Sequence, residues 1–305
     1  MDLLPAALKA TSGQHWAVPA LYIVATPIGN LADITARALA CLAMADVLAA
    51  EDTRVAQKLF AAYGITPKQL VRCDAHREEE ACAQLIAALA SGKRVALVSD
   101  AGTPAVSDPG ARVVAAVRAA GYAVVPLPGA SAVLTLLSAA GIADTPFSFV
   151  GFAPTKASEM DAWLEQLQTA RTTTVFFEAP QRAAATLAKL AQALSPLPAS
   201  TRRVVIGREL TKRFETIKSL LLSDAAQFIA TENKAMQGEW VIAVAPAEPM
   251  LDTTGDEAAH DGLLQKLLAH LPLKTAVQLA AELSGAHKNA LYERALLLKN
   301  ADGVT

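Results

Sequence analysis

The sequence predicts an α/β fold with two α/β domains, followed by a small helical tail. Three observations support this prediction. The chain has 305 residues, which is enough for more than one domain. Short apolar runs alternate with longer amphipathic stretches as far as residue 245, as expected for buried strands between helices. A stretch rich in Pro, Asp and Thr then separates this region from three short helical patterns that carry leucines.

The same alternation predicts the order of the parts. In the first domain, strands are expected near residues 21–25, 47–50, 95–98 and 123–125. In the second, they are expected near residues 147–152, 174–177, 203–206 and 240–244. The predicted parts are a flexible N-terminal segment over 1–20, a first α/β domain over 21–145, a second over 146–246, a linker over 247–261 and a three-helix tail over 262–305.

Composition excludes some classes of protein. A formal net charge of -2 does not indicate a general nucleic-acid binder, although a local basic patch is compatible with it. The cysteines Cys41, Cys73 and Cys82 form no C-x-x-C pair, so we expect neither a disulfide framework nor a metal site. No apolar run reaches the ~18–20 residues of a membrane span, and no signal peptide is recognisable, so a cytoplasmic protein without membrane contact is expected.

Unusual turns follow the four strands predicted in the first domain. They are Thr26–Asn30, Glu51–Arg54, Asp100–Pro104 and Pro128–Ser131. Gly lets the backbone approach a ligand closely and Pro fixes a turn, yet both are also ordinary turn residues. Because ligands of open α/β sheets bind beyond the carboxyl ends of the strands, four such turns at one edge favour a binding site there.

The usual nucleotide-binding patterns are absent from these turns. The first strand is not followed by G-x-G-x-x-G, and the chain has no G-x-x-x-x-G-K-[ST] motif. This weighs against NAD and ATP as ligands, and against the glycine-rich site found in most enzymes that use S-adenosylmethionine.

Several sequence blocks stand out in order along the chain. They are Ala25–Leu31, Ala50–Arg54, Val98–Pro104, Ser107–Gly110, Pro128–Ala132, Gly151–Pro154, Phe177–Arg182 and Gly207–Lys212, with Lys288–Tyr292 in the tail. Over residues 21 to about 245, these blocks resemble a family of small-subunit ribosomal RNA methyltransferases in the tetrapyrrole methylase superfamily. One departure is Arg77 after His76, where the family pattern has Asn.

The resemblance implies two α/β domains of the tetrapyrrole methylase type, with S-adenosylmethionine between them, and a homodimer. It implies methyl transfer to the 2′-oxygen of a cytidine ribose in the decoding region of small-subunit ribosomal RNA, with the assembled ribosomal subunit as the expected partner. By motif position, the residues implied to bind the cofactor are Pro27, Asp100, Gly102, Thr103, Ser131, Ala132 and Phe177.

The substrate side stays open at the level of sequence. Arg54, Arg182 and Lys212 are candidates for phosphate contacts. The candidates for a general base are Glu51, Glu178 and His76. Two of these bases have structural alternatives. Glu51 and Arg54 can pair with each other or cap a helix, and a lone His such as His76 is more often structural.

Two other functions compete with RNA methylation. One is methylation of a tetrapyrrole or another small molecule. The other is non-catalytic binding of RNA or DNA through the tail, which resembles a helix-turn-helix unit but is equally compatible with a plain helical cap. The basic and polar residues that could contact nucleic acid in the tail are Lys274, His287, Lys288, Asn289, Arg294 and Lys299. The acidic residues Glu282 and Glu293 lie between them and reduce the local positive charge.

Overall fold

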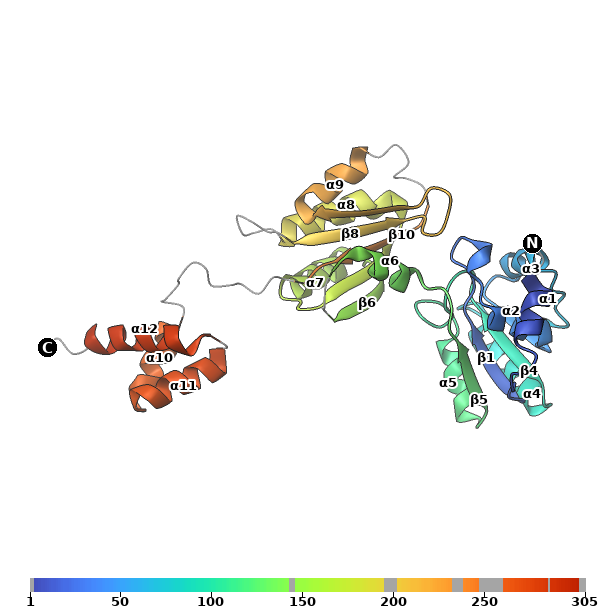
Figure 1. The fold of residues 1–305 in the computed structure, drawn as a ribbon, viewed down its shortest axis with the longest axis horizontal. Helices are drawn as coiled ribbons and strands as arrows, with labels where there is room; N and C mark the ends of the chain where they lie inside the picture. The colour runs from blue at the N-terminus through green and yellow to red at the C-terminus, as the bar shows by residue number, and fades with distance from the viewer. Residues whose placement is uncertain are drawn as a thin grey trace. The chain divides into compact units, whose positions relative to one another are not determined.

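The computed structural model describes residues 3–142, 146–194, 202–231, 238–246, 260–284 and 286–301. The chain divides into two units, Met1–Ala247 and Glu248–Thr305. The first unit contains two five-stranded sheets, and the second contains the helical tail (Figure 1). The predicted boundary between the two α/β domains falls on Asp144 and Thr145, which lie outside the described residues.

The first sheet is entirely parallel, with strand order β3-β2-β4-β1-β5. Its strands are β1 (Ala20–Val24), β2 (Val47–Ala50), β3 (Leu70–Arg72), β4 (Arg94–Val98) and β5 (Ala123–Leu127). The chain leaves β1 toward β2 on one side and leaves β4 toward β5 on the other. The carboxyl ends of β1 and β4 therefore form a topological switch point, where ligands of such sheets bind.

Helices cover both faces of this sheet. On one face lie α1 (Leu3–Ala10), α2 (Ala36–Met44) and α3 (Thr53–Ala62), packed on alternate strand residues such as Tyr22 and Val24. On the other face lie α4 (Glu78–Ala90) and α5 (Ala111–Ala119), packed on Leu21 and Ile23. Because successive strand residues point to opposite faces, the continuous apolar runs of the sequence fill both cores.

The N-terminal segment differs from its prediction as flexible. Residues Leu3–Ala10 form helix α1, Ala7 is buried, and Leu3 and Leu4 pack on the core beneath α2. Pro5 interrupts the apolar pattern but stands in the first helical turn, where its missing N–H has no helical partner to lose.

The second sheet is mixed, with strand order β6-β7-β10-β8-β9 and only the β6–β7 pair parallel. Its strands are β6 (Phe147–Phe152), β7 (Thr173–Glu178), β8 (Arg203–Arg208), β9 (Thr216–Leu221) and β10 (Trp240–Val244). Helices α7 (Ala157–Gln168), α8 (Pro180–Leu194) and α9 (Leu222–Thr231) cover one face.

Helix α6 (Ala132–Ala140) covers the other face of the second sheet, although it directly follows a strand of the first sheet. Its residues Val133, Leu136 and Ala140 are buried against Val175, Val205, Val241 and Ala243. The helix thus begins at the turn after β5 and packs on the second sheet. In this way α6 connects the two sheets.

The tail consists of α10 (Asp261–Leu268), α11 (Leu273–Ser284) and α12 (Lys288–Ala301), so the predicted three-helix unit is confirmed. Its core contains Leu264, Val277, Ala280, Leu291 and Ala295. Arg294 of α12 donates two hydrogen bonds to Asp261 at the start of α10. Most of the predicted linker, residues 247–259, lies outside the described residues. In the part of the chain that the structure describes, no helix is long and apolar enough to cross a membrane.

Candidate active site

The four turns predicted to form a site are joined to one another at the carboxyl edge of the first sheet. Thr26 and Gly102 exchange two backbone hydrogen bonds, of 2.8 and 3.0 Å. The Thr103 hydroxyl donates to the carbonyl of Ala130 at 3.1 Å. The backbone N–H of Asp52 donates to Oδ1 of Asp100 at 3.0 Å. The first, second, third and fourth turns therefore form one connected surface.

Gly129 shows how closely the fourth turn approaches the first. A Cβ atom at Gly129 would lie 2.7 Å from the Cβ of Ala25, a separation that folded proteins do not tolerate. Since neither atom is the end of a flexible side chain, the backbone itself would have to shift. Glycine is therefore required here for close packing of the two turns.

We expect Gly129→Ala to lower the free energy of unfolding by about 1–3 kcal/mol, the usual cost of overpacking. Urea denaturation measures the effect. Gly13→Ala is a matched control, because a Cβ atom at Gly13 meets nothing within 4 Å. Equal stability of the two variants would show that the first and fourth turns are not packed as described.

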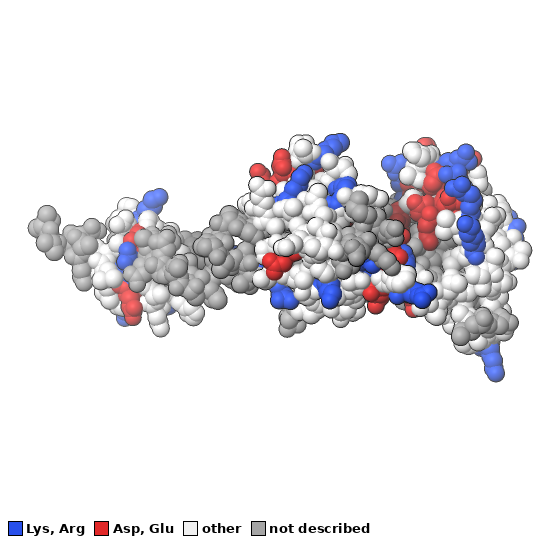
Figure 2. Space-filling view, turned by 90° about the horizontal axis from the view of Figure 1, so that it is seen from above, with Lys and Arg blue, Asp and Glu red and all other residues white. Residues whose placement is uncertain are grey.

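Carboxylates gather beside these turns. Glu51 is half-buried and accepts a hydrogen bond from the backbone N–H of Asp100. Burial raises the pKa of Glu51, and the nearby charges of Asp100, Asp108 and Asp74 raise it further. Figure 2 shows Asp and Glu side chains gathered next to Lys and Arg side chains on the region that carries the first sheet. The surface there is mixed in charge and not uniformly basic.

Asp108 is a member of this group that the sequence did not single out. Burial raises its pKa and the charge of Asp100 raises it further, while interaction with the Ser99 hydroxyl opposes the rise. The signal was present, because Asp108 lies in the block Ser107–Gly110 that resembles the methyltransferase family, but no role was attached to it. Within the described ranges, no three His, Cys, Asp or Glu side chains are grouped so as to hold a metal ion.

Two loops with unusual backbone conformations join the first sheet region to the second. Among the described residues other than glycine, φ is positive at Ala105 and Ser107 after β4 and at Glu209 and Thr211 after β8. Such conformations cost on the order of 1–3 kcal/mol each and cluster at functional sites. Both loops lie against a glycine: a Cβ atom at Gly151 would meet Ser107 Oγ at 2.8 Å, and one at Gly29 would meet Lys212 Cγ at 2.5 Å.

Lys212 lies close to the first turn, but its ammonium group is paired with two carboxylates. Its Nζ donates to Glu209 at 2.9 Å and to Glu239 at 3.1 Å. Burial opposes protonation of Lys212, yet these two carboxylates outweigh it and raise its pKa. The side chain therefore ties the Gly207–Lys212 block to the region before β10, beside Gly29.

Glu178 and Arg182 form a closed network inside the second sheet region. The Glu178 side chain is 0% exposed and lies 3.3 Å from the Arg182 guanidinium. Its oxygens accept hydrogen bonds from the backbone N–H of Ala179 and the hydroxyl of Thr186. Arg182 also donates to the carbonyls of Ala153 and Pro154. This geometry favours a structural role for both residues over contact with a substrate.

The remaining candidates lie outside that network. His76 is exposed in a turn whose backbone N–H groups are held by Asp74. The Arg54 side chain is 83% exposed and pairs with Asp52 at 2.6 Å. Among these three candidate bases, Glu51 is the one that belongs to the joined turns, and it accepts a hydrogen bond from the backbone N–H of Asp100.

The predicted cofactor residues lie at or beside the joined turns, with one exception. Pro27 is buried in the first turn, and Ser131 caps helix α6 through Leu134 N at 3.5 Å, with Ala132 as the first helical residue. Phe177 belongs to β7 of the second sheet, where its ring meets those of Phe149 and Phe152 edge to face. Its contact with a cofactor stays a prediction.

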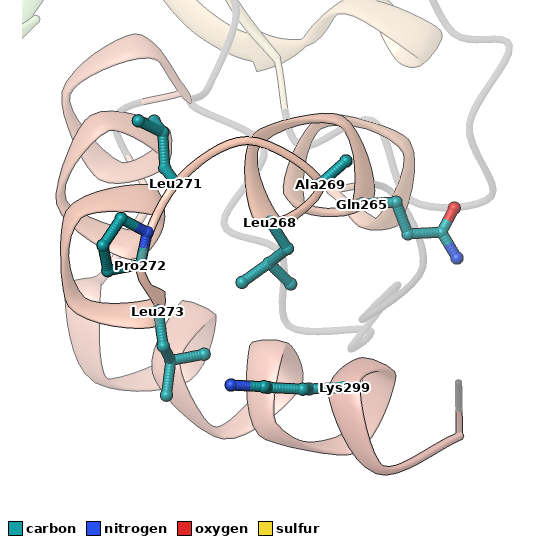
Figure 3. Close-up of a pocket in the computed structure, with 7 residues that line it drawn as sticks. All are labelled: Gln265, Leu268, Ala269, Leu271, Pro272, Leu273 and Lys299. Carbon is teal, nitrogen blue, oxygen red and sulfur yellow. The ribbon is translucent and has the colours of Figure 1, made fainter. Parts of the chain in front are cut away.

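The tail has its own concave surface. A pocket of about 300 Å³ lies beside the turn between α10 and α11 (Figure 3). Its lining is mainly apolar, with the Lys299 side chain reaching across from α12. A second pocket is lined by Lys274, Thr275, Gln278, Lys288 and Tyr292, which include two of the basic residues singled out in the sequence.

The two sheets, their switch point and the joined turns define a methylase of the tetrapyrrole type. Residues 20–226 match the family described as Tetrapyrrole (Corrin/Porphyrin) Methylases, and residues 254–299 match the RsmI C-terminal HTH domain. One similar solved structure is the cobalt precorrin-4 methyltransferase CbiF, with a TM-score of 0.55 and 21% identity, covering 73% of this chain and 94% of that one. Another is a uroporphyrin-III C-methyltransferase from Thermus thermophilus in complex with S-adenosylhomocysteine, with a TM-score of 0.50 and 17% identity, covering 73% and 96%.

Relatives with similar sequences identify one family within this class of methylases. A protein of Mesorhizobium japonicum named ribosomal RNA small subunit methyltransferase I is 46% identical over 93% of this chain and 94% of its own length. A protein of the same name from Neisseria meningitidis is 45% identical over 92% of this chain and 94% of its own length. The chain belongs to the ribosomal RNA small subunit methyltransferase I family.

Proposed function

We propose that this chain transfers a methyl group from S-adenosylmethionine to the 2′-oxygen of a cytidine ribose in the decoding region of small-subunit ribosomal RNA. The match to the RNA methyltransferases extends over more than nine-tenths of the chain and includes the tail, and this observation carries the proposal. The fold neighbours named for tetrapyrrole substrates are similar at 17–21% identity, which concerns the fold alone.

The residues at the joined turns fit a nucleoside-containing cofactor. Asp100 is exposed at the end of a buried strand, where its carboxylate can accept bonds from hydroxyl or amino donors. Gly102, two residues after Asp100, has a positive φ that favours glycine in this turn, and the N-terminus of α6 follows Ser131. Pro27, Thr103 and Ala132 would complete the contact from the same edge, with Phe177 reaching it from the second sheet.

The chain's own residues would position the acceptor and remove its proton. When bound, S-adenosylmethionine supplies a methyl group that its sulfonium charge has already activated. Glu51 would accept the proton of the 2′-hydroxyl, because it is half-buried and its pKa is raised toward the range of an effective base. Arg54, whose guanidinium is largely exposed, is the side chain best placed to contact a phosphate.

Methyl mapping on RNA tests the proposed reaction. The purified full chain is incubated with S-adenosylmethionine carrying a deuterated methyl group and with assembled small subunits, naked small-subunit RNA or a porphyrinogen. We expect a label on one cytidine ribose and a higher yield on the assembled subunit. A label on the porphyrinogen alone would establish the small-molecule alternative. Saturable cofactor binding without transfer to any RNA would establish a non-catalytic binding protein.

We further propose that the active species is a cytoplasmic homodimer. Light scattering of the purified chain, and fractionation of cells that produce it, measure these two properties. A monomer with full turnover would exclude the dimer as a requirement.

A further inference from the structure

Phe152 is an aromatic side chain left in solvent at the end of a core strand. It is the last residue of β6, and 62% of it is exposed. A phenylalanine ring usually contributes far more stability when buried, because it has a large apolar surface and no polar group. Its exposure at the end of an ordered strand leaves a flat apolar surface available to a ligand.

The strand is bent so that this ring takes its present position. The register between β6 and β7 shifts between Phe149 and Phe152, which is the mark of a β-bulge. Bulges bend a strand and redirect a side chain, and they are frequent beside active sites. The rings of Phe149 and Phe152 both meet Phe177 edge to face, at centroid distances of 4.9 and 5.6 Å. Phe177 thus supports Phe152 from one side and leaves its other surface open.

The segment after Phe152 is held in place. The backbone N–H of Ala153 donates to the carbonyl of Phe177 at 3.1 Å. The Arg182 guanidinium binds the carbonyls of Ala153 and Pro154, at 3.0 and 2.8 Å. Arg182 is in turn paired with the fully buried Glu178. The exposed ring therefore stands on a rigid support, and binding a flat ligand would cost little ordering.

Phe152 is one residue away from a contact with the loop after β4. The residue before it, Gly151, lies so close to Ser107 that a Cβ atom would meet the serine Oγ at 2.8 Å. Ser107 belongs to the loop after β4, which contains Asp100 and Asp108, two neighbours of Glu51. Phe152 therefore follows a residue that contacts the same loop that carries two neighbours of Glu51.

We propose that Phe152 is the platform on which the base of the target nucleotide stacks, and this rests on the proposed function. Proteins that recognise a particular nucleotide of RNA usually bind it in an unstacked segment and stack its base on an aromatic ring. Stacking needs no particular base, so Phe152 positions the nucleotide and leaves sequence selection to other contacts.

The variant Phe152→Ala tests the platform. We expect kcat/KM for the small subunit to fall by about 5- to 150-fold, the range for loss of one stacked base. Phe152→Tyr and Phe152→Trp keep a flat ring and are expected to stay within about threefold of the parent protein. Affinity for S-adenosylhomocysteine, measured by calorimetry, is expected to be unchanged in all three variants.

Phe147→Ala is the matched control, because Phe147 is 48% exposed at the opposite end of the same strand. An equal loss in Phe147→Ala and Phe152→Ala would overturn the proposal, as would full turnover of Phe152→Ala. Weaker cofactor binding by Phe152→Ala would assign the ring to the adenine and also overturn it. If the parent protein methylates no RNA, the proposed function fails, and this result is distinct from a failure of the platform alone.

Discussion

The variant Glu51→Gln is expected to lose turnover by about 10²- to 10⁴-fold, the usual contribution of general base catalysis. The amide keeps the shape of the side chain and can still accept the hydrogen bond from the backbone N–H of Asp100. It cannot take up the proton of the 2′-hydroxyl. Single-turnover methyl transfer to small subunits measures the chemical step without product release.

The pH dependence identifies the cause of the loss. Burial and the neighbouring carboxylates raise the pKa of Glu51. Only the ionised form can act as a base, so the rate for the parent protein should rise with pH through this raised pKa, above the usual value of about 4.3 for Glu. That rise should disappear in Glu51→Gln. A variant that keeps both full turnover and the same rise would exclude Glu51 as the base.

The free energy of unfolding of Glu51→Gln shows whether a loss of turnover comes from the chemistry or from the fold. A carboxyl group whose pKa is raised in the folded state contributes stability below its unfolded pKa and loses that contribution as pH rises through the folded value. At pH 7 the ionised Glu51 is therefore unfavourable to folding. Because solvent screens a half-exposed group, we expect Glu51→Gln to be more stable by at most ~1 kcal/mol. Glu79→Gln, an exposed carboxylate in the first turn of α4, is the matched control.

The variant Glu178→Ala is expected to lower the free energy of unfolding by about 3–5 kcal/mol, the usual cost of removing one partner of a buried ion pair. The change leaves the Thr186 hydroxyl and the Arg182 guanidinium without their carboxylate. Urea denaturation of the full chain, followed by circular dichroism, measures it. Lys156→Ala is the control, because the Lys156–Glu159 pair is exposed and its loss should cost less than about 1 kcal/mol.

This result also decides between two roles for Glu178. If Glu178→Ala folds with unchanged stability but loses turnover, the residue is catalytic and its hydrogen bonds do not stabilise the fold. If Glu178→Gln recovers most of the stability and methyl transfer together, the carboxylate serves the fold. The Gln oxygen can accept from the Ala179 N–H and its NH2 group can donate to the Thr186 hydroxyl oxygen, so Gln keeps the size and polarity of the side chain and removes only its charge.

The sequence alone was sufficient to predict the positions of the strands that are continuously apolar. Runs such as those of β1 and β4 are buried on both faces and have few alternatives to a parallel strand. Strand β3 was missed because three residues carry too little periodicity. Strand β9 was missed because its residues show no regular alternation and are only half-buried or exposed at an edge of the sheet. The joining of the four turns followed from the rule that parallel strands end at one edge.

The choice among the candidate bases depended on tertiary contacts. Glu51 and Glu178 both follow or end an apolar run and look alike in the sequence. The difference is that Arg182 in the first turn of α8 and Thr186 in the second turn enclose the carboxylate of Glu178. The exposure of Phe152 was equally hidden, because an aromatic residue at the end of an apolar strand is ordinarily expected to be buried.

Helix α6 sets a limit on how this protein can be divided. By chain order it belongs with the first sheet, but Val133, Leu136 and Ala140 are buried on the second. A fragment that ends at residue 145 would carry this helix with its apolar stripe uncovered, and a fragment that starts at residue 146 would lack the cover of one sheet face. Each piece is expected to aggregate when produced alone, whereas the two together should recombine, which gel filtration of separate and co-produced fragments would reveal.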